Sequence, residues 1–330
     1  MNARKYIRSI LRIIIAAAVC LFILIMAAGV AVRQPIFGSY DFPPGLRADA
    51  KALRTHVEFL SRDLAPRNLQ HPDKINRVAD YIGATLVREG AIVSEQTYTV
   101  DKVRCRNIIG RFGSATGHLI VIGAHYDVHG DQPGADDNAS GVAGVLELAR
   151  LLKGRTLSSP IMLVAFSTEE PPYFGSNAMG SAVHAQALRK VGVDVAAMLS
   201  LEMIGYFSEE QLDKNLFLRA VYPQCGDFIV IAGRWSDRLL ARQVKRAFHG
   251  AGSPPVYSFT GPIEMGIDLS DHRSYWAEGY SAVMVTDTAH LRNPNYHASG
   301  DRSETLDYDK MAKVVDGVFN AVVHLASQGK

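Results

Sequence analysis

The residues of this sequence best suited to chemistry are histidines and carboxylates that follow short apolar runs. His125 and Asp127 come directly after one run, the pair Glu169 and Glu170 follows the next, and Glu202 ends a third. The other candidates lie in two loops: Gly-Ala-Asp-Asp-Asn-Ala-Ser-Gly at 134–141, and the stretch that carries His290 and His297. Carboxylates that converge from separate loops repel one another unless a positive charge lies between them, so this pattern predicts a divalent metal ion or a pair of them.

Each feature alone has an ordinary structural explanation. An isolated His-x-Asp is most often a capped strand end, and Asp136-Asp137-Asn138 could be the N-cap of a helix. Adjacent glutamates are usually solvated, Glu202 could be ion-paired, and His297 could be an ordinary loop histidine. The combination indicates function, because ligands in open α/β sheets gather outside the carboxyl ends of the strands.

Short continuous apolar runs would form the strands that position these side chains. The runs are 119–124, 161–166, 196–201 and 282–285, with 228–232 as a fifth, and helical patterns separate them at 139–153, 175–190, 236–250 and 308–326. Two further amphipathic patterns lie near 48–64 and 74–90, and 93–100 alternates like a half-buried strand. This arrangement is typical of a mostly parallel sheet covered on both faces. We therefore expect an α/β protein, a three-layer α/β/α sandwich around a mostly parallel mixed sheet, whose edge could carry antiparallel strands.

Composition narrows the function classes. The chain has 330 residues and a formal net charge of +2, so nothing indicates a nucleic-acid surface. Its three cysteines form no C-x-x-C pair, which excludes a cysteine zinc site or a thioredoxin-type motif. We interpret Cys105 and Cys225 as free, buried thiols, although their pairing stays open, and Cys20 lies in the apolar N-terminal run. The sequence contains neither a G-x-S-x-G elbow nor a P-loop G-K-[ST].

The N-terminal segment predicts a membrane helix. Residues 13–32 carry no charge and follow four cations, and at ~1.5 Å per residue they span about 30 Å, the thickness of a bilayer core. A cleavable signal peptide usually has an apolar stretch of only ~7–15 residues, but Gly29-Val30-Ala31 leaves cleavage open. The excess of cations before the span places the N-terminus in the cytoplasm. We expect a cytoplasmic basic segment (1–12), a transmembrane signal anchor (13–32), a stalk (33–47) and a globular domain (48–330) on the periplasmic, extracellular or lumenal side.

Taken together, the motifs resemble the M28 family of zinc peptidases, the aminopeptidase and glutamate-carboxypeptidase group. They are H-Y-D at 125–127, G-A-D-D-N-A-S-G at 134–141, F-S-T-E-E at 166–170, L-E-M at 201–203, N-Y-H at 295–297 and S-D-H-R-S-Y-W-A-E-G-Y at 270–280. The resemblance covers roughly 50–327. It implies a zinc-exopeptidase-like fold, peptide substrates and two zinc ions per chain, with manganese or cobalt as substitutes.

The resemblance also implies roles for single residues. Asp137 would bridge the two metals, Glu170 and His297 would complete one site, and His125 and Glu202 would complete the other. Glu169 would be the general base that takes a proton from a metal-bridged water.

Other matching positions would support these ligands. Asp127 would hold the His125 imidazole in the right tautomer. Asp136 would be supportive rather than a ligand, and Asn138 would cap a helix that begins near Ala139.

Some positions depart from the family pattern or stay open. Many relatives have Asp where this chain has Glu202, and Pro171-Pro172 stiffens the loop after the glutamates. Tyr173 and Phe174 could line the pocket or pack in the core. Asp271-His272 could shape the active-site loop or bind substrate, and His290 would be substrate-side or incidental.

An aminopeptidase is the favoured function because every implied ligand is present. A carboxypeptidase would need cations for a terminal carboxylate, and the sequence alone does not place Arg234, Arg273 or Arg292. A glutaminyl cyclase of this fold typically lacks the intact D-D-N-A-S-G segment, and receptor-like relatives usually lose ligands. The sequence predicts neither the side-chain preference nor the oligomeric state.

Overall fold

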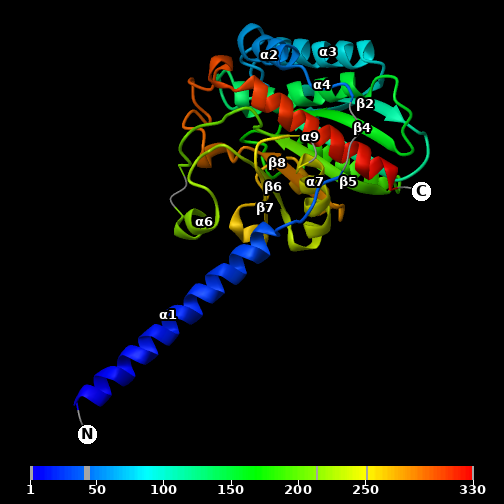
Figure 1. Cartoon of the computed structure of the whole chain (residues 1–330). Helices are drawn as coiled ribbons and strands as arrows, with labels where there is room; N and C mark the ends of the chain where they lie inside the picture. The colour runs from blue at the N-terminus through cyan, green and yellow to red at the C-terminus, as the bar shows by residue number, and fades with distance from the viewer. Residues whose placement is uncertain (1–2, 41–44, 213–214, 250–251, 329–330) are drawn as a thin grey trace.

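A mixed eight-stranded sheet forms the centre of the structure, a computed structural model that describes residues 3–40, 45–212, 215–249 and 252–328 (Figure 1). In spatial order the strands are β1 (Ile92–Val100), β2 (Val103–Gly113), β4 (Pro160–Phe166), β3 (Leu119–His125), β5 (Val195–Glu202), β8 (Ala282–Thr286), β6 (Ile229–Arg234) and β7 (Val256–Gly261). The central strands β4, β3, β5 and β8 are parallel. At the edges, β2 is antiparallel to β4 and β6 is antiparallel to β8, so the expected mixed sheet is confirmed.

Helices cover both faces of this sheet. The helices are α2 (Ala50–Glu58), α3 (Pro72–Arg88), α4 (Gly141–Leu152), α5 (Gly180–Lys190), α6 (Leu216–Val221), α7 (Arg238–His249), α8 (His272–Ala277) and α9 (Tyr308–Ser327). Residues of α2, α3, α4, α7 and α9 share one buried apolar cluster with the strands, and residues of α5 and α8 share a second with the other face. The chain is therefore the expected three-layer α/β/α sandwich.

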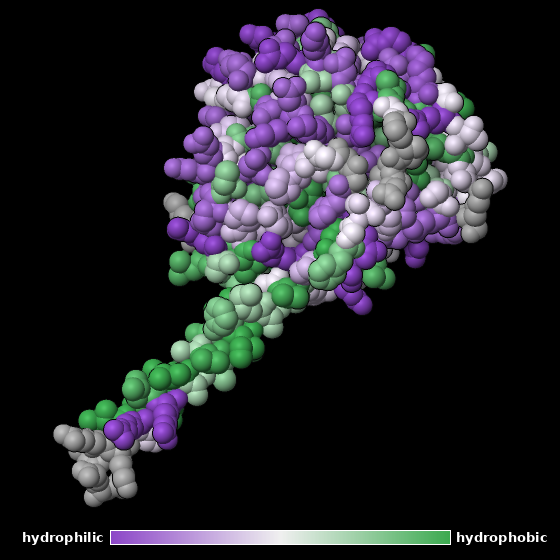
Figure 2. Space-filling model, in the orientation of Figure 1, coloured by the Kyte–Doolittle hydropathy of each residue, from purple (hydrophilic) through white to green (hydrophobic). Residues whose placement is uncertain are grey.

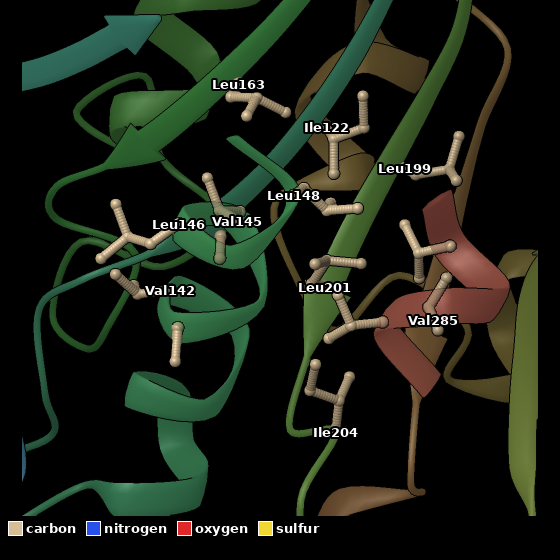
Figure 3. Close-up of a cluster of buried hydrophobic side chains, with 14 of the residues drawn as sticks. Ile122, Val142, Val145, Leu146, Leu148, Leu163, Leu199, Leu201, Ile204 and Val285 are labelled. Carbon is tan, nitrogen blue, oxygen red and sulfur yellow. The ribbon is translucent and has the colours of Figure 1, made fainter. Parts of the chain in front are cut away.

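The core explains why the central strands are continuous apolar runs. Every residue of β3 is buried, because helices pack on both of its faces. Figure 3 shows Leu148 of α4 next to Ile122 of β3, with Leu199 of β5 nearby. This packing fixes the strand ends from which the candidate ligands project.

The N-terminal helix α1 (Ala3–Arg33) projects away from the domain (Figure 1). Its stretch Tyr6–Arg33 has a mean hydropathy of 3.0 over the best 18-residue window, of which only 6% is buried, so it is long and apolar enough to cross a membrane. A signal sequence would satisfy the same criteria. The chain that follows contacts the domain, since the Tyr40 ring stacks on His324 and the Ala48 N–H donates to Asp316.

The cysteines correct one detail of the sequence interpretation. Cys105 and Cys225 are both free, as expected, but only Cys105 is buried. Cys225 follows α6 in a loop and is exposed.

Candidate metal centre

The carboxyl ends of three parallel strands position most of the candidate ligands. His125 is the last residue of β3 and Glu202 is the last residue of β5. Glu169 and Glu170 follow the end of β4 at Phe166. The parallel register of these strands brings all four side chains to one edge of the sheet, where each is buried.

Asp137 lies between two histidine–carboxylate pairs. Its Oδ1 is 3.4 Å from His125 Nε2, and its Oδ2 is 3.1 Å from His297 Nε2. His125 Nε2 is also 3.4 Å from Glu202 Oε2, and His297 Nε2 is 3.2 Å from Glu170 Oε2. The structure thus brings together all five residues that the sequence nominated as metal ligands.

The chemistry of this cluster fits bound divalent cations. Ligand atoms of His125, Asp137 and Glu202 lie within 4.8 Å of one another, as do those of Asp137, Glu170 and His297. Asp137 Oδ1 and Glu170 Oε1 are buried and have no hydrogen-bond partner. Unpartnered buried polar atoms are costly, and a cation placed between them would satisfy them. Imidazole and carboxylate groups without a thiolate suit zinc.

Burial and crowding perturb the acid–base groups of the cluster. Burial raises the pKa of Glu170 to about 7, and the neighbouring Asp137 carboxylate contributes in the same direction. Burial lowers the pKa of His297, but its hydrogen bonds with Asp137 and Glu170 outweigh this and raise it to about 10. Both shifts show that carboxylates are crowded together in the cluster, and a cation bound among them would relieve this repulsion.

Glu169 lies beside the cluster and lines the cavity above it. Its Oε2 is 3.8 Å from His125 Nε2. Burial raises its pKa well above the usual value, and the nearby Glu170 and Glu202 add to the shift, against the opposing effect of His125. A carboxyl group in this position can exchange a proton with a molecule bound in the cavity.

Asp127 organises the loop that carries both glutamates. Its two oxygens accept the backbone N–H groups of Glu169 and Glu170, at 3.1 and 3.0 Å. Its Oδ1 is also 3.4 Å from His125 Nδ1, on the side expected of a residue that orients this imidazole. The contact with the two backbone amides was not predicted from the sequence.

Two supporting residues were missed by sequence reasoning. The Asp301 carboxylate accepts the backbone N–H groups of Asp136 and Asp137, at 2.8 and 3.0 Å. The buried Arg67 guanidinium donates to the carbonyls of Pro133 and Gly134 in the same loop. Asp301 lies four residues after His297, and this proximity was a usable signal; Arg67 has no motif around it.

Asn138 connects the Asp137 loop to β5. Its Nδ2 donates to Leu201 O at 2.8 Å and to Glu202 Oε2 at 3.2 Å, while its Oδ1 accepts the N–H of Gly141 at the start of α4. The helix thus begins slightly later than the sequence predicted, with Asn138 capping it. Ser270 also donates to Glu202 Oε2, at 2.7 Å.

Some of the remaining candidate residues pack inside the domain, and others line the cavity. His272 is buried against Trp276 and bonds to the carbonyl of Ile267, a structural role, and Asp271 is buried beside it. Phe174 and His290 line the cavity. The Tyr173 hydroxyl donates to Asp101 instead.

The three candidate arginines lie outside the cavity wall. Arg234 pairs with Asp237, and Arg273 pairs with Asp268. Arg292 is buried and donates to the carbonyl of Phe228.

A cavity of about 590 Å³ opens above this cluster of candidate ligands. Its wall is largely apolar, with contributions from α6, β6, β7, β8 and the loop after β7: Leu218, Val230, Ala232, Phe259, Met265, Leu269 and Met284. Among the described residues that line it, none is a lysine or an arginine. The cavity therefore combines an acidic floor with apolar walls.

Comparison with known proteins agrees with this geometry. The sequence profile of peptidase family M28 matches residues 107–322. A protein of Escherichia coli strain K12, described as "Uncharacterized protein YfbL", is 42% identical over 318 residues, which cover 93% of this chain and 97% of that protein. A probable zinc metalloprotease of Pyricularia oryzae is 29% identical over 63% of this chain, which spans about half (47%) of that relative's length.

Solved structures share the fold. A zinc aminopeptidase from Bacillus subtilis aligns with a TM-score of 0.69 and 15% identity, over 85% of this chain and 96% of that one. A glutaminyl cyclase from Porphyromonas gingivalis aligns with a TM-score of 0.66 and 20% identity, over 84% and 99% of the two chains. At these identities the likeness concerns the fold alone.

Proposed function

The chain belongs to peptidase family M28, and we propose that it is a two-zinc aminopeptidase that removes N-terminal residues from peptides. The observation that carries the proposal is the position of Asp137, whose two carboxylate oxygens lie 3.4 Å from His125 Nε2 and 3.1 Å from His297 Nε2. One carboxylate facing two histidine–carboxylate pairs supports a site for two cations. In this proposal His125, Asp137 and Glu202 hold one ion, and Asp137, Glu170 and His297 hold the other.

The bound ions would polarise the scissile carbonyl and lower the pKa of a water molecule from about 16 to near 7. Glu169 takes up the proton of the attacking water and delivers it to the leaving amine. Asp127 keeps Glu169 and Glu170 in register through their backbone N–H groups, at 3.1 and 3.0 Å. Asp301 fixes the backbone of Asp137 in the same way.

The cavity supports an aminopeptidase over a carboxypeptidase. A terminal carboxylate needs a cation, and none of the described residues that line the cavity is a lysine or an arginine. The acidic floor instead suits the ammonium group of a peptide N-terminus. The intact Asp137 segment argues against the cyclase alternative, in which a single zinc suffices.

We propose in addition that α1 (Ala3–Arg33) remains attached as a single-pass anchor. The basic segment 1–12 would lie in the cytoplasm and the segment 13–32 in the bilayer. The domain 48–330 would face the periplasm, the outside or a lumen, because cations concentrate before the span.

The proposal is tested on the purified full chain in detergent. Metal content is measured by plasma mass spectrometry, and hydrolysis is measured on aminoacyl amides and their N-acetylated counterparts, with and without chelator. We expect two zinc ions per chain and chelator-sensitive hydrolysis of the free amines only. Cleavage of only the blocked substrates contradicts the aminopeptidase assignment. Release of ammonia from an N-terminal glutamine without peptide cleavage indicates a cyclase.

A further inference from the structure

The end of α1 is locked to the domain by a buried lysine. The Lys245 ammonium on α7 is 4% exposed, and its three protons are all used. They are donated to Arg33 O at 2.7 Å, to Gln34 O at 2.8 Å and to Ser258 Oγ of β7 at 3.0 Å. A cation at a helix C-terminus also interacts favourably with the helix dipole. The junction is therefore rigid and is sealed against the edge strand of the sheet.

The contact extends up α1 into its apolar stretch. Arg33 donates to Val221 O of α6 at 2.8 Å, and its guanidinium lies 4.5 Å from the centre of the Tyr257 ring. Val32 is only 5% exposed. A Cβ added at Gly29 would lie 3.3 Å from Val221, so α6 already packs against α1 at this level.

Because the end of α1 packs directly against α6 and β7, the domain would lie against the surface of any membrane that α1 crosses. The twenty charge-free residues 13–32 span about 30 Å, which is the full thickness of the hydrocarbon core. Within the last four of these residues, about 6 Å of helix, Gly29 and Val32 already lie against the domain. If the whole apolar stretch lies in the bilayer, α6 and the end of β7 must enter the headgroup region.

Exposed apolar side chains lie on α6, which contacts α1, and in the loop after β7, together with the exposed charged residues Arg219 and Glu264. On α6, Leu216 is 81% exposed, and in the loop after β7, Ile263, Met265 and Leu269 are between 38% and 46% exposed. Figure 1 shows α6 and β7 at the end of the domain from which α1 projects, and Figure 2 shows hydrophobic atoms along the lower edge of the domain near that junction. We call these four residues the rim.

The rim also borders the catalytic cavity. Met265 and Leu269 line the cavity, and so does Leu218, which lies two residues after Leu216 on the short helix α6. A surface that rests on the membrane through the rim therefore brings the mouth of the cavity to the membrane surface.

We propose that the rim lies in the interfacial layer of the same phospholipid bilayer that α1 crosses, so that the enzyme acts on peptides held at the membrane surface. This inference rests on the membrane anchoring proposed above. Apolar side chains on an interfacial element bury about 5–10 Å into the headgroup–acyl boundary, and a rigid junction holds the rim at that depth without further loss of conformational freedom.

The first test measures the depth of the rim. Full chains carrying Leu216→Trp or, as a matched control, Ile92→Trp are reconstituted in phosphatidylcholine vesicles with and without brominated acyl chains. Ile92 is 76% exposed and lies on β1, at the opposite edge of the sheet. Native Trp235 and Trp276 contribute equally to both samples. We expect the brominated chains to lower the added emission at position 216, because a side chain at the acyl boundary lies within reach of the bromines, and to leave that at position 92 unchanged. Equal quenching at the two positions overturns the proposal.

Alkaline carbonate extraction of the same vesicles separates the two proposals. Release of the chain refutes the anchor itself, whereas retention without quenching at position 216 refutes only the docked rim.

The second test measures function. The double variant Leu216→Glu/Ile263→Glu leaves the described cavity wall intact, and Val87→Glu/Ile92→Glu, on the α3 side of the domain, is its control. We expect the first variant to hydrolyse soluble aminoacyl amides normally but to lose about tenfold against a peptide tethered by its C-terminus to a phospholipid headgroup, the factor that one apolar side chain carries. Equal rates of the two double variants on the tethered peptide would refute the membrane-surface substrate.

Discussion

Asp301 offers a sharp test of how the metal cluster is held. Its carboxylate accepts two buried backbone N–H groups, from Asp136 at 2.8 Å and Asp137 at 3.0 Å. Asp301→Ala leaves both donors unpaired, and each unpaired donor costs about 1–3 kcal/mol, so we expect the free energy of unfolding to fall by about 2–6 kcal/mol. Asp301→Asn keeps one acceptor and should cost about half as much. Because Asp137 is the shared ligand of our proposal, zinc affinity should also fall by about 10–100-fold in both variants.

The two effects are separated by a matched control. Asp316 is a buried carboxylate on α9 that accepts the backbone N–H of Ala48 at 2.9 Å, and it belongs to none of the candidate metal groups. Denaturant unfolding in chelator gives the stability of each variant, and competition with a fluorescent zinc chelator gives its affinity. We expect Asp316→Ala to lose stability and keep zinc affinity. If Asp301→Asn binds zinc as tightly as the parent, Asp301 supports the fold alone and the argument that it positions Asp137 is wrong.

Three further predictions concern the base, the packing of the site and the response to acid. Glu169→Gln should retain bound zinc but lose about 10²–10⁴-fold in kcat, because proton transfer is removed; loss of metal together with activity would instead indicate a ligand role. A Cβ at Gly141 would lie 2.5 Å from Leu201 O, so Gly141→Ala should cost about 1–3 kcal/mol in denaturant unfolding. Gly83→Ala, where the nearest atom is 3.8 Å away in a helix, should stabilise by about 0.5–1 kcal/mol and is its control. Burial lowers the pKa of His184 to about 4, below its unfolded value, so its neutral form stabilises the fold above pH 6.5 and this contribution is lost as the pH falls toward 4. In chelator, the free energy of unfolding of His184→Asn should therefore fall by about 2–3 kcal/mol less than that of the parent between pH 7.5 and pH 4.5. If the free energies of the two proteins fall by the same amount, the burial argument is wrong.

The parts of the fold that were predictable are those with a simple hydrophobic period. The runs at 119–124, 161–166 and 196–201 correspond to β3, β4 and β5 because strands covered on both faces must be apolar throughout. Strands β2 (Val103–Gly113) and β7 (Val256–Gly261) were not predicted. Strand β2 contains Arg104 and Arg106, and β7 contains Ser258 and Thr260. These polar groups interrupt the apolar pattern and find partners only in the folded chain. Arg106 pairs with Glu95, and Ser258 donates a hydrogen bond to the carbonyl of Arg33 at the end of α1.

The candidate ligands were predictable because they lie at strand ends or in recognisable loop motifs, whereas two of their supporting residues were not predicted. Asp301 acts on the backbone of a segment more than 160 residues away, and Arg67 acts on carbonyls that any residue would supply. The position of Asp301 four residues after His297 was a usable signal, but the Arg67 contacts leave no pattern of spacing or residue type in the sequence. The contact between Lys245 and the end of α1 was not predicted either. The lysine donates to the backbone carbonyls of Arg33 and Gln34, which any residue would supply.

The two backbone amides bound by Asp127 have a consequence for how this enzyme could change over time. This one carboxylate positions both a proposed base and a proposed ligand, because its two oxygens accept the backbone N–H groups of Glu169 and Glu170. A substitution that shifts this carboxylate displaces both glutamates at once. If the two glutamates act as proposed, turnover and ion retention would be coupled through Asp127, and a substitution there would change both.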